Sequence, residues 1–326
     1  MAKEFDIVIA GGGIAGMSAA VTSARLGRST LILTGEVFGG QLLSIEKIDG
    51  LPGYPDGIPG YDLCPIMQDQ ASAAGAEFMM SSLERLEARN GTWHVATGEG
   101  DVTARGVIIA TGSALKTLDV PGEKRLAGSG VSQCATCDAP LLRGRIVTVV
   151  GGGDSALQEA LTLAEFATKV IILHRGGALA GQAYYRDRVT AHAKIEIRPN
   201  TVVTEILGEA TVSGVRTQDA SGVTSDIEAA AVFAYVGLQP NTGVLDGLVR
   251  MNNTGCIPTD ASMRTELAGL CAAGNVRALS AGRAASAAGD GTSAAVALDH
   301  YLTGGSWRDG QRADASAHKS AAAAHG

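Results

Sequence analysis

The stretch FDIVIAGGGIAG at residues 5–16 decides the fold of the chain. Residues 5–10 are an apolar run typical of a buried β-strand. The glycines that follow, Gly11, Gly13 and Gly16, have the G-x-G-x-x-G spacing of a dinucleotide-binding turn. In such a turn the first glycine permits the sharp bend, the second lets the backbone approach a pyrophosphate, and the third lets the helix pack closely on the strand.

The sequence after this turn completes a βαβ unit. Residues 17–26 favour a helix, and residues 29–33 form a second strand-like run. The N-terminus of such a helix presents free N–H groups to phosphate oxygens. Glu36 follows Gly16 by 20 residues, where an acid can bind a ribose hydroxyl. The segment therefore predicts a dinucleotide site and not merely a glycine-rich turn.

A second copy of this pattern occurs in the middle of the chain. The strand-like run 145–150 leads into GGGDSA at 151–156, which has the spacing G-x-G-x-x-A. A helix is predicted from about residue 155 to 167, and a further strand at residues 169–173. His174 and Arg175 follow in place of an acid, and an arginine there suits a 2′-phosphate better than a free ribose hydroxyl.

Two dinucleotide sites in one chain favour a flavin that exchanges electrons with a nicotinamide, or a duplicated fold in which one site is empty. Short apolar runs that end in glycine turns, at 106–112 and 269–275, flank the second unit. The second unit is therefore expected to be inserted into the first, with crossings near 118–122 and 239–242. We expect an α/β fold with two Rossmann-like dinucleotide-binding domains.

The expected domain limits follow from these crossings. Residues 1–118 and 243–305 form the expected flavin domain, and residues 119–242 form the nicotinamide domain that carries a cysteine pair. Residues 306–326 lack apolar periodicity and are expected to be a poorly ordered tail.

Composition narrows the possible functions. The 44 glycines and a hydrophobic content of 45% suit an α/β enzyme with tight strand-to-helix turns. A net charge of −7 argues against a nucleic-acid footprint. No apolar run is long enough to span a bilayer, and the N-terminus has no signal-peptide pattern, so we expect a cytoplasmic protein.

The segment VSQCATCDAP at 131–140 contains two of the five cysteines, Cys134 and Cys137. A zinc site usually needs two such pairs, and the other cysteines are isolated in sequence. A structural disulfide is disfavoured in the cytoplasm. A redox dithiol is left, since C-x-x-C spacing lowers one thiol pKa and supplies a thiolate near neutral pH.

Taken together, these motifs resemble the low-molecular-weight thioredoxin reductases, which are flavoprotein disulfide reductases. The resemblance covers about residues 5–303. It implies FAD and NADPH as cofactors, a homodimer, and rotation of the inserted domain between two working positions. The motifs that carry it are GGGIAG at 11–16, TGEVFGGQL at 34–42, ATG at 110–112, CATCD at 134–138, GGGDSALQEAL at 151–161 and the block at 269–295.

The resemblance implies cofactor contacts at particular residues. Those expected at the FAD are Gly11, Gly13, Ala15, Gly16, Glu36, Gly40, Gln41, Thr111, Gly112, Gly274, Asn275 and Arg283. Those expected at the nicotinamide nucleotide are Gly151, Gly153, Asp154, Ser155, Ala156, His174 and Arg175.

The resemblance also implies a role for each residue of the CATCD segment. Cys137 is the sulfur nearer the flavin, and the Cys134–Cys137 disulfide receives electrons from the reduced flavin. Cys134 then attacks the disulfide of thioredoxin or a thioredoxin-like protein. Asp138 is the expected proton donor and acceptor, although an acid there also suits a turn or helix cap.

The chain departs from this family at its cofactor motifs. Members that use NADPH usually carry H-R-R-x-x-x-R, whereas this chain has HRGGALA at 174–180. The usual G-D turn is Gly274-Asn275, and the aromatic-Arg-Gln run beside the flavin ring is AGRAA at 281–285. The donor is therefore open between NADPH, NADH and reduced ferredoxin, and the substrate could be a small disulfide or dithiol. A flavin-binding redox sensor without turnover is the alternative from another class.

Overall fold

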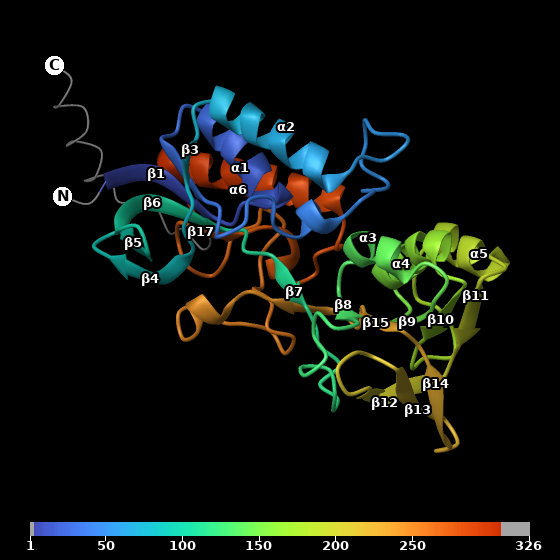
Figure 1. Cartoon of the computed structure of the whole chain (residues 1–326). Coiled ribbons are helices and arrows are strands. Elements are labelled where there is room, and N and C mark those ends of the chain that lie inside the picture. Colours follow the sequence, from blue (N-terminus) through green and yellow to red (C-terminus); the bar gives the residue numbers. More distant parts are fainter. Residues whose placement is uncertain (1–2, 308–326) are drawn as a thin grey trace. The chain divides into compact units, whose positions relative to one another are not determined.

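The computed structural model describes residues 3–307 and divides the chain into two compact units (Figure 1). The first unit extends to Ala114 and resumes at Pro240, and the second runs from Leu115 to Gln239. The second unit is thus inserted between two parts of the first. The boundaries expected from sequence, at residues 118 and 242, lie close to these positions.

The first unit is built on a seven-stranded sheet of order β3-β2-β1-β6-β5-β4, in which β17 also pairs with β6. Strands β1, β2, β3, β6 and β17 are parallel, whereas β4 and β5 form an antiparallel hairpin beside β6. The strands are β1 (Lys3–Ala10), β2 (Thr30–Leu33), β3 (Glu77–Met79), β4 (Leu83–Arg89), β5 (Thr92–Thr97), β6 (Val102–Ile109) and β17 (Leu270–Ala272).

Three helices cover one face of this sheet (Figure 1): α1 (Ile14–Arg25), α2 (Gly60–Ala73) and α6 (Ala284–Leu302). Alternate residues of a strand point to opposite faces. Ile7 and Ile9 of β1 therefore pack with the helices, while Val8 packs in a second core on the opposite face, together with Trp93. The apolar run at residues 5–10 is buried on both sides for this reason.

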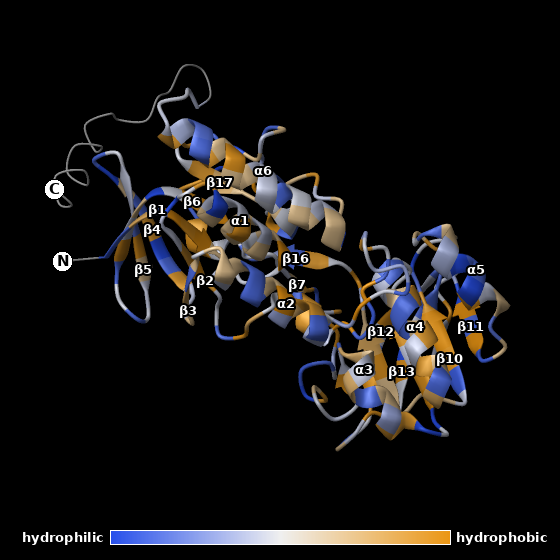
Figure 2. Ribbon diagram, turned by 90° about the horizontal axis from the view of Figure 1, so that it is seen from above, coloured by the Kyte–Doolittle hydropathy of each residue, from blue (hydrophilic) through white to orange (hydrophobic). Residues whose placement is uncertain are grey.

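The second unit has a five-stranded parallel sheet of order β11-β10-β9-β15-β8. Helix α4 packs on one face, where Val149 and Leu163 belong to one core cluster. The antiparallel sheet β12-β13-β14 packs on the other face, where Leu173 and Val215 belong to another. Figure 2 shows strand β10 in hydrophobic colours and much of helix α5 in hydrophilic ones. The elements are β8 (Val131–Ser132), α3 (Ala135–Asp138), β9 (Ile146–Val150), α4 (Asp154–Phe166), β10 (Lys169–Leu173), α5 (Ala183–Ala191), β11 (Ile195–Arg198), β12 (Thr201–Leu207), β13 (Gly214–Asp219), β14 (Thr224–Glu228) and β15 (Ala231–Ala234).

The two crossings between the units are themselves paired strands. Strand β7 (Ser113–Leu115) leads into the inserted unit, strand β16 (Leu238–Pro240) leads out, and the two form a two-stranded sheet. The chain thus leaves and re-enters the first unit at one place.

The α/β fold with two Rossmann-like units is confirmed, and strand β10 has the predicted bounds. Helix α1 begins at Ile14, not at residue 17, because Gly13 is its N-cap and the motif itself forms the first turn. The expectation of a poorly ordered tail from residue 306 is wrong for Trp307. Its side chain is only 3% exposed, and its indole N–H donates to the Thr265 carbonyl at 3.1 Å. The rest of that tail lies outside the described residues.

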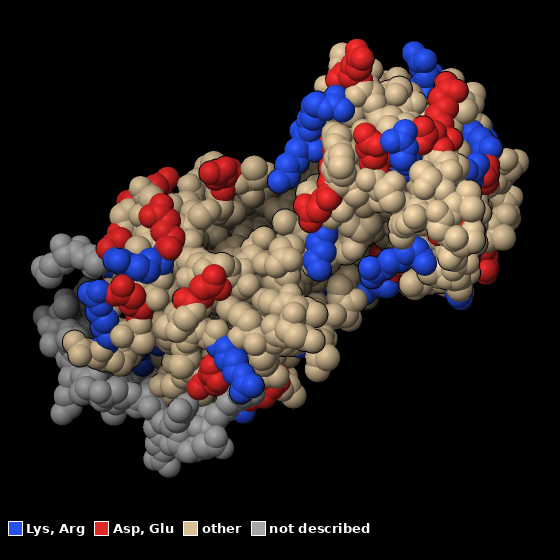
Figure 3. Space-filling model, turned by 90° about the horizontal axis from the view of Figure 1, so that it is seen from below, with Lys and Arg blue, Asp and Glu red and all other residues tan. Residues whose placement is uncertain are grey.

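Between residues 3 and 307 no helix is long and apolar enough to cross a bilayer. Figure 3 shows acidic and basic side chains interspersed over the face that it presents.

Candidate functional site

The first glycine turn lies between strand β1 and helix α1 and has no room for side chains at two of its three glycines. Gly11 has φ of 122°, and a Cβ on it would lie 2.2 Å from the Ala110 carbonyl oxygen. A Cβ on Gly16 would lie 1.8 Å from the carbonyl oxygen of Gly11. Both contacts are impossible, so these two glycines are required by the packing of the turn.

Gly13 is different, because a Cβ built on it would meet no protein atom within 4 Å. It is the N-cap of α1, no side chain caps the helix there, and the first turn contains no acidic residue. The N–H groups of the first turn of α1 therefore point into open space. The positive end of the helix dipole lies at the same place. This cradle fits the pyrophosphate of a dinucleotide.

The loop after β2 lies against this cradle. The N–H of Gly39 donates to the Gly12 carbonyl at 3.2 Å, and a Cβ on Gly40 would lie 3.7 Å from the Gly13 Cα. The side-chain amide of Gln41 donates to the Ser113 carbonyl. Gly40 thus lies at the glycine turn, Gln41 contacts the segment after β6, and Glu36 is an exposed residue of the same loop.

Thr111 and Gly112 follow strand β6 and are tied to a residue that the sequence did not single out. The Thr111 hydroxyl donates to the Asn241 carbonyl at 2.7 Å, and the Asn241 side-chain amide donates to the Thr111 carbonyl at 2.9 Å. The backbone N–H of Asn241 donates to the Gly112 carbonyl at 3.0 Å. The sequence pointed to Asn241 only through its place in the polar crossing expected near residues 239–242.

The turn after strand β17 contributes Gly274 and Asn275, in a single turn of 3₁₀ helix over Gly274–Val276. Gly274 has φ of 77°, and the Asn275 side-chain oxygen accepts from the Ser280 hydroxyl at 3.3 Å. A Cβ on Gly274 would lie 3.0 Å from the Ala15 Cβ, so this turn adjoins the start of α1. Arg283 is the exposed N-cap residue of α6.

The second glycine turn repeats this construction in the inserted unit. Gly151 has φ of 142°, and a Cβ on it would lie 2.3 Å from the Tyr235 carbonyl oxygen. Ala156 is fully buried in the place of the third glycine, and Gly153 again faces open space at the N-cap of α4. Asp154 and Ser155 form the first turn of the helix, so the expected residues come together here as well.

The loop after β10 folds back over this second turn. The N–H groups of Ala180 and Gly181 both donate to the Gly152 carbonyl, at 2.8 and 3.0 Å. The Asp154 carboxylate accepts from the backbone and side-chain N–H groups of Gln182, at 2.6 and 2.9 Å. Neither Gly152 nor Gln182 was predicted as a site residue from the sequence.

The residues at the beginning of that loop differ in exposure. Arg175, Gly176 and Gly177 are exposed, which leaves a single cation directly after the strand. His174 is 6% exposed, and its ring would be 3.4 Å from a Cβ on Gly152. Burial lowers the pKa of His174 below its ordinary value, because an apolar environment disfavours the charged imidazolium.

Cys134 and Cys137 lie at the two ends of one helical turn and are joined by a disulfide, with Cα atoms 5.4 Å apart. Cys134 is the N-cap of α3, and its sulfur accepts from the Cys137 N–H at 3.3 Å. Cys137 is exposed, whereas Cys134 and Asp138 are half-buried. The helix N-terminus favours a thiolate at Cys134 when the disulfide is open.

The base of this short helix is packed into the core of the inserted unit. Ala135 and Ala139 are fully buried in the same cluster as Tyr235. Burial, with a smaller contribution from the negative charge of Glu159, raises the pKa of Tyr235, so its phenol stays protonated at neutral pH. The short helix that carries the dithiol is therefore anchored in this core by Ala135 and Ala139.

The remaining cysteines are not part of this arrangement. Cys64 and Cys271 are buried and Cys256 is half-buried, and none of the three is in a disulfide. Burial raises the pKa of Cys64, which makes its thiol unreactive. Within residues 3–307, no group of three or more His, Cys, Asp and Glu side chains is arranged to hold a metal ion.

Comparison with known proteins gives consistent matches over almost the whole chain. The sequence profile of the family described as "Pyridine nucleotide-disulphide oxidoreductase" matches residues 5–297. The chain is 37% identical to the thioredoxin reductase of Treponema pallidum over 303 residues, which are 93% of this chain and 98% of that protein. It is 37% identical to the thioredoxin reductase of Bacillus subtilis over 302 residues, 92% and 95% of the two chains. The crystal structure of Lactococcus lactis thioredoxin reductase is similar with a TM-score of 0.89 and 33% identity, covering 92% of this chain and 99% of that one.

Proposed function

The chain belongs to the pyridine nucleotide-disulphide oxidoreductases, among the thioredoxin reductases, and from this premise we propose that it passes electrons from a nicotinamide nucleotide through FAD to its Cys134–Cys137 disulfide and on to thioredoxin or a thioredoxin-like protein. The observation that carries the proposal is an accessible C-x-x-C disulfide at a helix N-terminus, in a chain with two open dinucleotide cradles. We also propose the domain limits given above, with residues 119–242 as the nicotinamide domain.

FAD fits the first cradle. The α1 N-terminus at Gly13 would hold its pyrophosphate, Glu36 a ribose hydroxyl, and the Gly274–Asn275 turn its ribityl chain. Asn275 can serve a ribityl hydroxyl as a neutral donor or acceptor. Bound FAD supplies the exchange of two electrons between a nicotinamide and the disulfide.

The dithiol would carry out the second half of the reaction by thiol–disulfide exchange. The Cys134 thiolate attacks one sulfur of the substrate disulfide, which forms a mixed disulfide and expels one substrate thiolate. The Cys137 thiolate then attacks the Cys134 sulfur, expels the second substrate thiolate and restores the Cys134–Cys137 disulfide. Two electrons leave the protein and two substrate thiolates accept protons from solvent or from an acid.

Asp138 is the proposed acid. It follows Cys137 directly and ends the same helix, and its N–H donates to the Cys134 carbonyl at 3.3 Å. Asp138 is half-buried, and in this role its carboxyl group would protonate a departing thiolate as a general acid.

The nicotinamide nucleotide would bind the second cradle, with its pyrophosphate at Gly153 and its adenosine ribose near His174 and Arg175. NADPH is the proposed donor and NADH is the alternative. The alternative is kept because Gly176 and Ala180 stand where H-R-R-x-x-x-R has arginines, so Arg175 is the one arginine of HRGGALA that could meet a 2′-phosphate. Reduced ferredoxin is a further donor that the experiment below includes.

A protein partner is supported by the surface beside the dithiol. Leu141, three residues after Asp138, is 81% exposed, and an exposed apolar side chain next to a reactive pair suits a docking protein. A small disulfide is the alternative substrate. We further propose a homodimer, on the family resemblance. We also propose a cytoplasmic location, because Cys64, Cys256 and Cys271 are not joined in disulfides, which suits a reducing compartment.

Anaerobic mixing of the FAD-loaded protein with each donor tests the proposal. NADPH or NADH should bleach the flavin absorbance, and added thioredoxin should restore it. Cys134→Ser should abolish disulfide turnover while the donor still bleaches the flavin, and Cys256→Ser, a half-buried control, should retain turnover. Flavin that no donor reduces would favour the sensor alternative, and turnover that survives Cys134→Ser would exclude this dithiol.

A further inference from the structure

A buried ion pair lies beneath the turn after strand β17. The Arg277 guanidinium meets the Asp290 carboxylate with two bonds, Nε to Oδ2 at 2.6 Å and Nη2 to Oδ1 at 2.9 Å. The two side chains are only 16% and 8% exposed. The same Oδ2 of Asp290 accepts the backbone N–H of Gly274 at 3.1 Å. One carboxylate therefore joins the ion pair to the first residue of the turn.

This pair ties three segments together. Asp290 lies on α6, and Gly291 beside it packs so closely on α1 that a Cβ would lie 2.0 Å from the Ala15 carbonyl oxygen. Gly274 lies against the same residue of α1. Asp290 thus fixes the Gly274–Asn275 turn relative to the open N-terminus of α1, which is the proposed pyrophosphate cradle.

The burial of the pair indicates a role beyond stability. Removing two charges from water is unfavourable, and an apolar pair of similar size is often as stable. A bidentate pair, however, fixes geometry in a way that apolar contacts do not. Asp290 also satisfies a buried backbone N–H in a left-handed conformation, which no apolar side chain could do.

We propose that Arg277 and Asp290 are positioning residues for the flavin: the pair holds the Gly274–Asn275 turn at the spacing from the α1 N-terminus that one FAD molecule must bridge. The proposal rests on the proposed function, since it assigns the ribityl chain to Asn275 and the pyrophosphate to Gly13.

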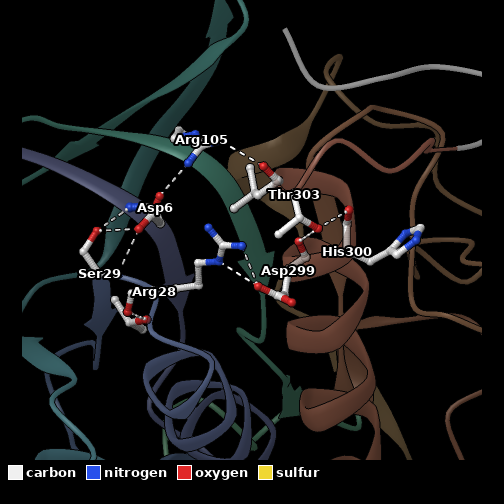
Figure 4. A network of polar contacts seen from close by, with 9 residues as sticks. Asp6, Arg28, Ser29, Arg105, Asp299, His300 and Thr303 are labelled. Carbon is white, nitrogen blue, oxygen red and sulfur yellow. Dashed lines mark hydrogen bonds and ion pairs between the residues drawn. The ribbon is translucent and has the colours of Figure 1, made fainter. Parts of the chain in front are cut away.

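A second ion pair on the same helix gives a matched control. Arg28 and Asp299 meet through Nε and Nη2, each 2.7 Å from Oδ1, with side chains 15% and 24% exposed. Figure 4 shows this pair near the C-terminal end of α6, in a network that includes Asp6 and Arg105 and none of the residues assigned to the flavin. It resembles the first pair in chemistry and burial but touches no cofactor segment.

The experiment compares Asp290→Asn with Asp299→Asn in the full chain. The dissociation constant of FAD is measured by flavin fluorescence on apoprotein, and the unfolding of the same apoprotein is followed in urea. Asp290→Asn should raise the FAD dissociation constant at least 10-fold, whereas Asp299→Asn should leave it within 2-fold at a similar loss of stability. Equal dissociation constants for Asp290→Asn and the unaltered chain, or equal increases in both variants, would overturn the proposal.

Two further variants keep the test decisive if Asp290→Asn does not fold. Arg277→Lys keeps the positive charge but cannot make both hydrogen bonds of the guanidinium to Asp290. It should therefore weaken FAD binding less than removal of the Asp290 carboxylate does. Arg277→Met combined with Asp290→Leu removes both charges and should fold, yet should still bind FAD at least 10-fold more weakly. Normal affinity in this double variant contradicts the proposal. An unaltered chain that binds no FAD contradicts the proposed function itself, which separates the two failures.

Discussion

The Asp154 carboxylate holds Gln182 by two hydrogen bonds, one to its backbone N–H at 2.6 Å and one to its side-chain amide at 2.9 Å. Asp154 begins helix α4, and Gln182 ends the loop that starts at His174. The two residues therefore close this loop over the second glycine turn, with help from the Gly152 carbonyl.

Loss of the two Asp154–Gln182 hydrogen bonds should weaken the binding of the nicotinamide nucleotide but not that of FAD. We expect Asp154→Ala to raise KM for the nicotinamide nucleotide about 10-fold, equivalent to about 1.4 kcal/mol, because the loop loses both bonds to the carboxylate. FAD content should stay unchanged. Steady-state kinetics at saturating thioredoxin checks this, with Asp187→Ala on the exposed face of α5 as the control. An unchanged KM would mean that the loop position does not matter for donor binding.

Gly13 and Gly16 should respond in opposite ways to alanine. A Cβ on Gly13 enters open space, and the backbone there, with φ of −81°, accepts alanine, so Gly13→Ala should fold normally but bind FAD at least 10-fold more weakly. A Cβ on Gly16 collides with Gly11, so Gly16→Ala should destabilise the apoprotein by about 1–3 kcal/mol or more. Urea unfolding and FAD titration separate the two effects. Normal FAD affinity in Gly13→Ala would show that the cradle is not used.

The donor preference should depend on the loop after β10. We expect Gly176→Arg with Ala180→Arg to raise the ratio of kcat/KM for NADPH over NADH at least 10-fold, because each charge-assisted bond to a 2′-phosphate is worth about 1.5–3 kcal/mol. Gly176 has room, since a Cβ there would lie 3.7 Å from its nearest neighbour. Thr190→Arg on α5 adds a charge outside the loop and should leave the ratio unchanged. A ratio unmoved by the double variant would place the 2′-phosphate elsewhere.

His174 should make stability depend on pH. Burial lowers its pKa in the folded chain, so between the folded value and the ordinary value near 6.5 the unfolded chain binds more protons. Its stabilising contribution is therefore complete above about pH 6.5 and is lost as the pH falls through the folded pKa. The free energy of unfolding in urea, measured from pH 8 to pH 5, should fall less steeply in His174→Gln. Parallel curves for both proteins would refute the assignment.

Much of the fold and site could be predicted because the relevant information is local. A strand, a glycine turn and a helix follow one another within residues 5–25, and their spacing specifies the turn by steric necessity, as the collision at Gly16 illustrates. The C-x-x-C pair is also local, since three residues of one helical turn bring Cys134 and Cys137 into disulfide distance. The sequence alone therefore determined the two Rossmann-like units, the insertion and the redox pair.

Only the tertiary structure decided which distant residues complete these sites. Asn241 meets Thr111 across 130 positions of chain, and Asp290 reaches Gly274 from the second turn of a helix whose own pattern indicates only packing. Trp307, expected in a poorly ordered tail, is buried against Thr265. Such partners depend on strand order and on how closely α6 approaches α1. Near neighbours in sequence do not encode these distances, because they are set by the packing of whole elements.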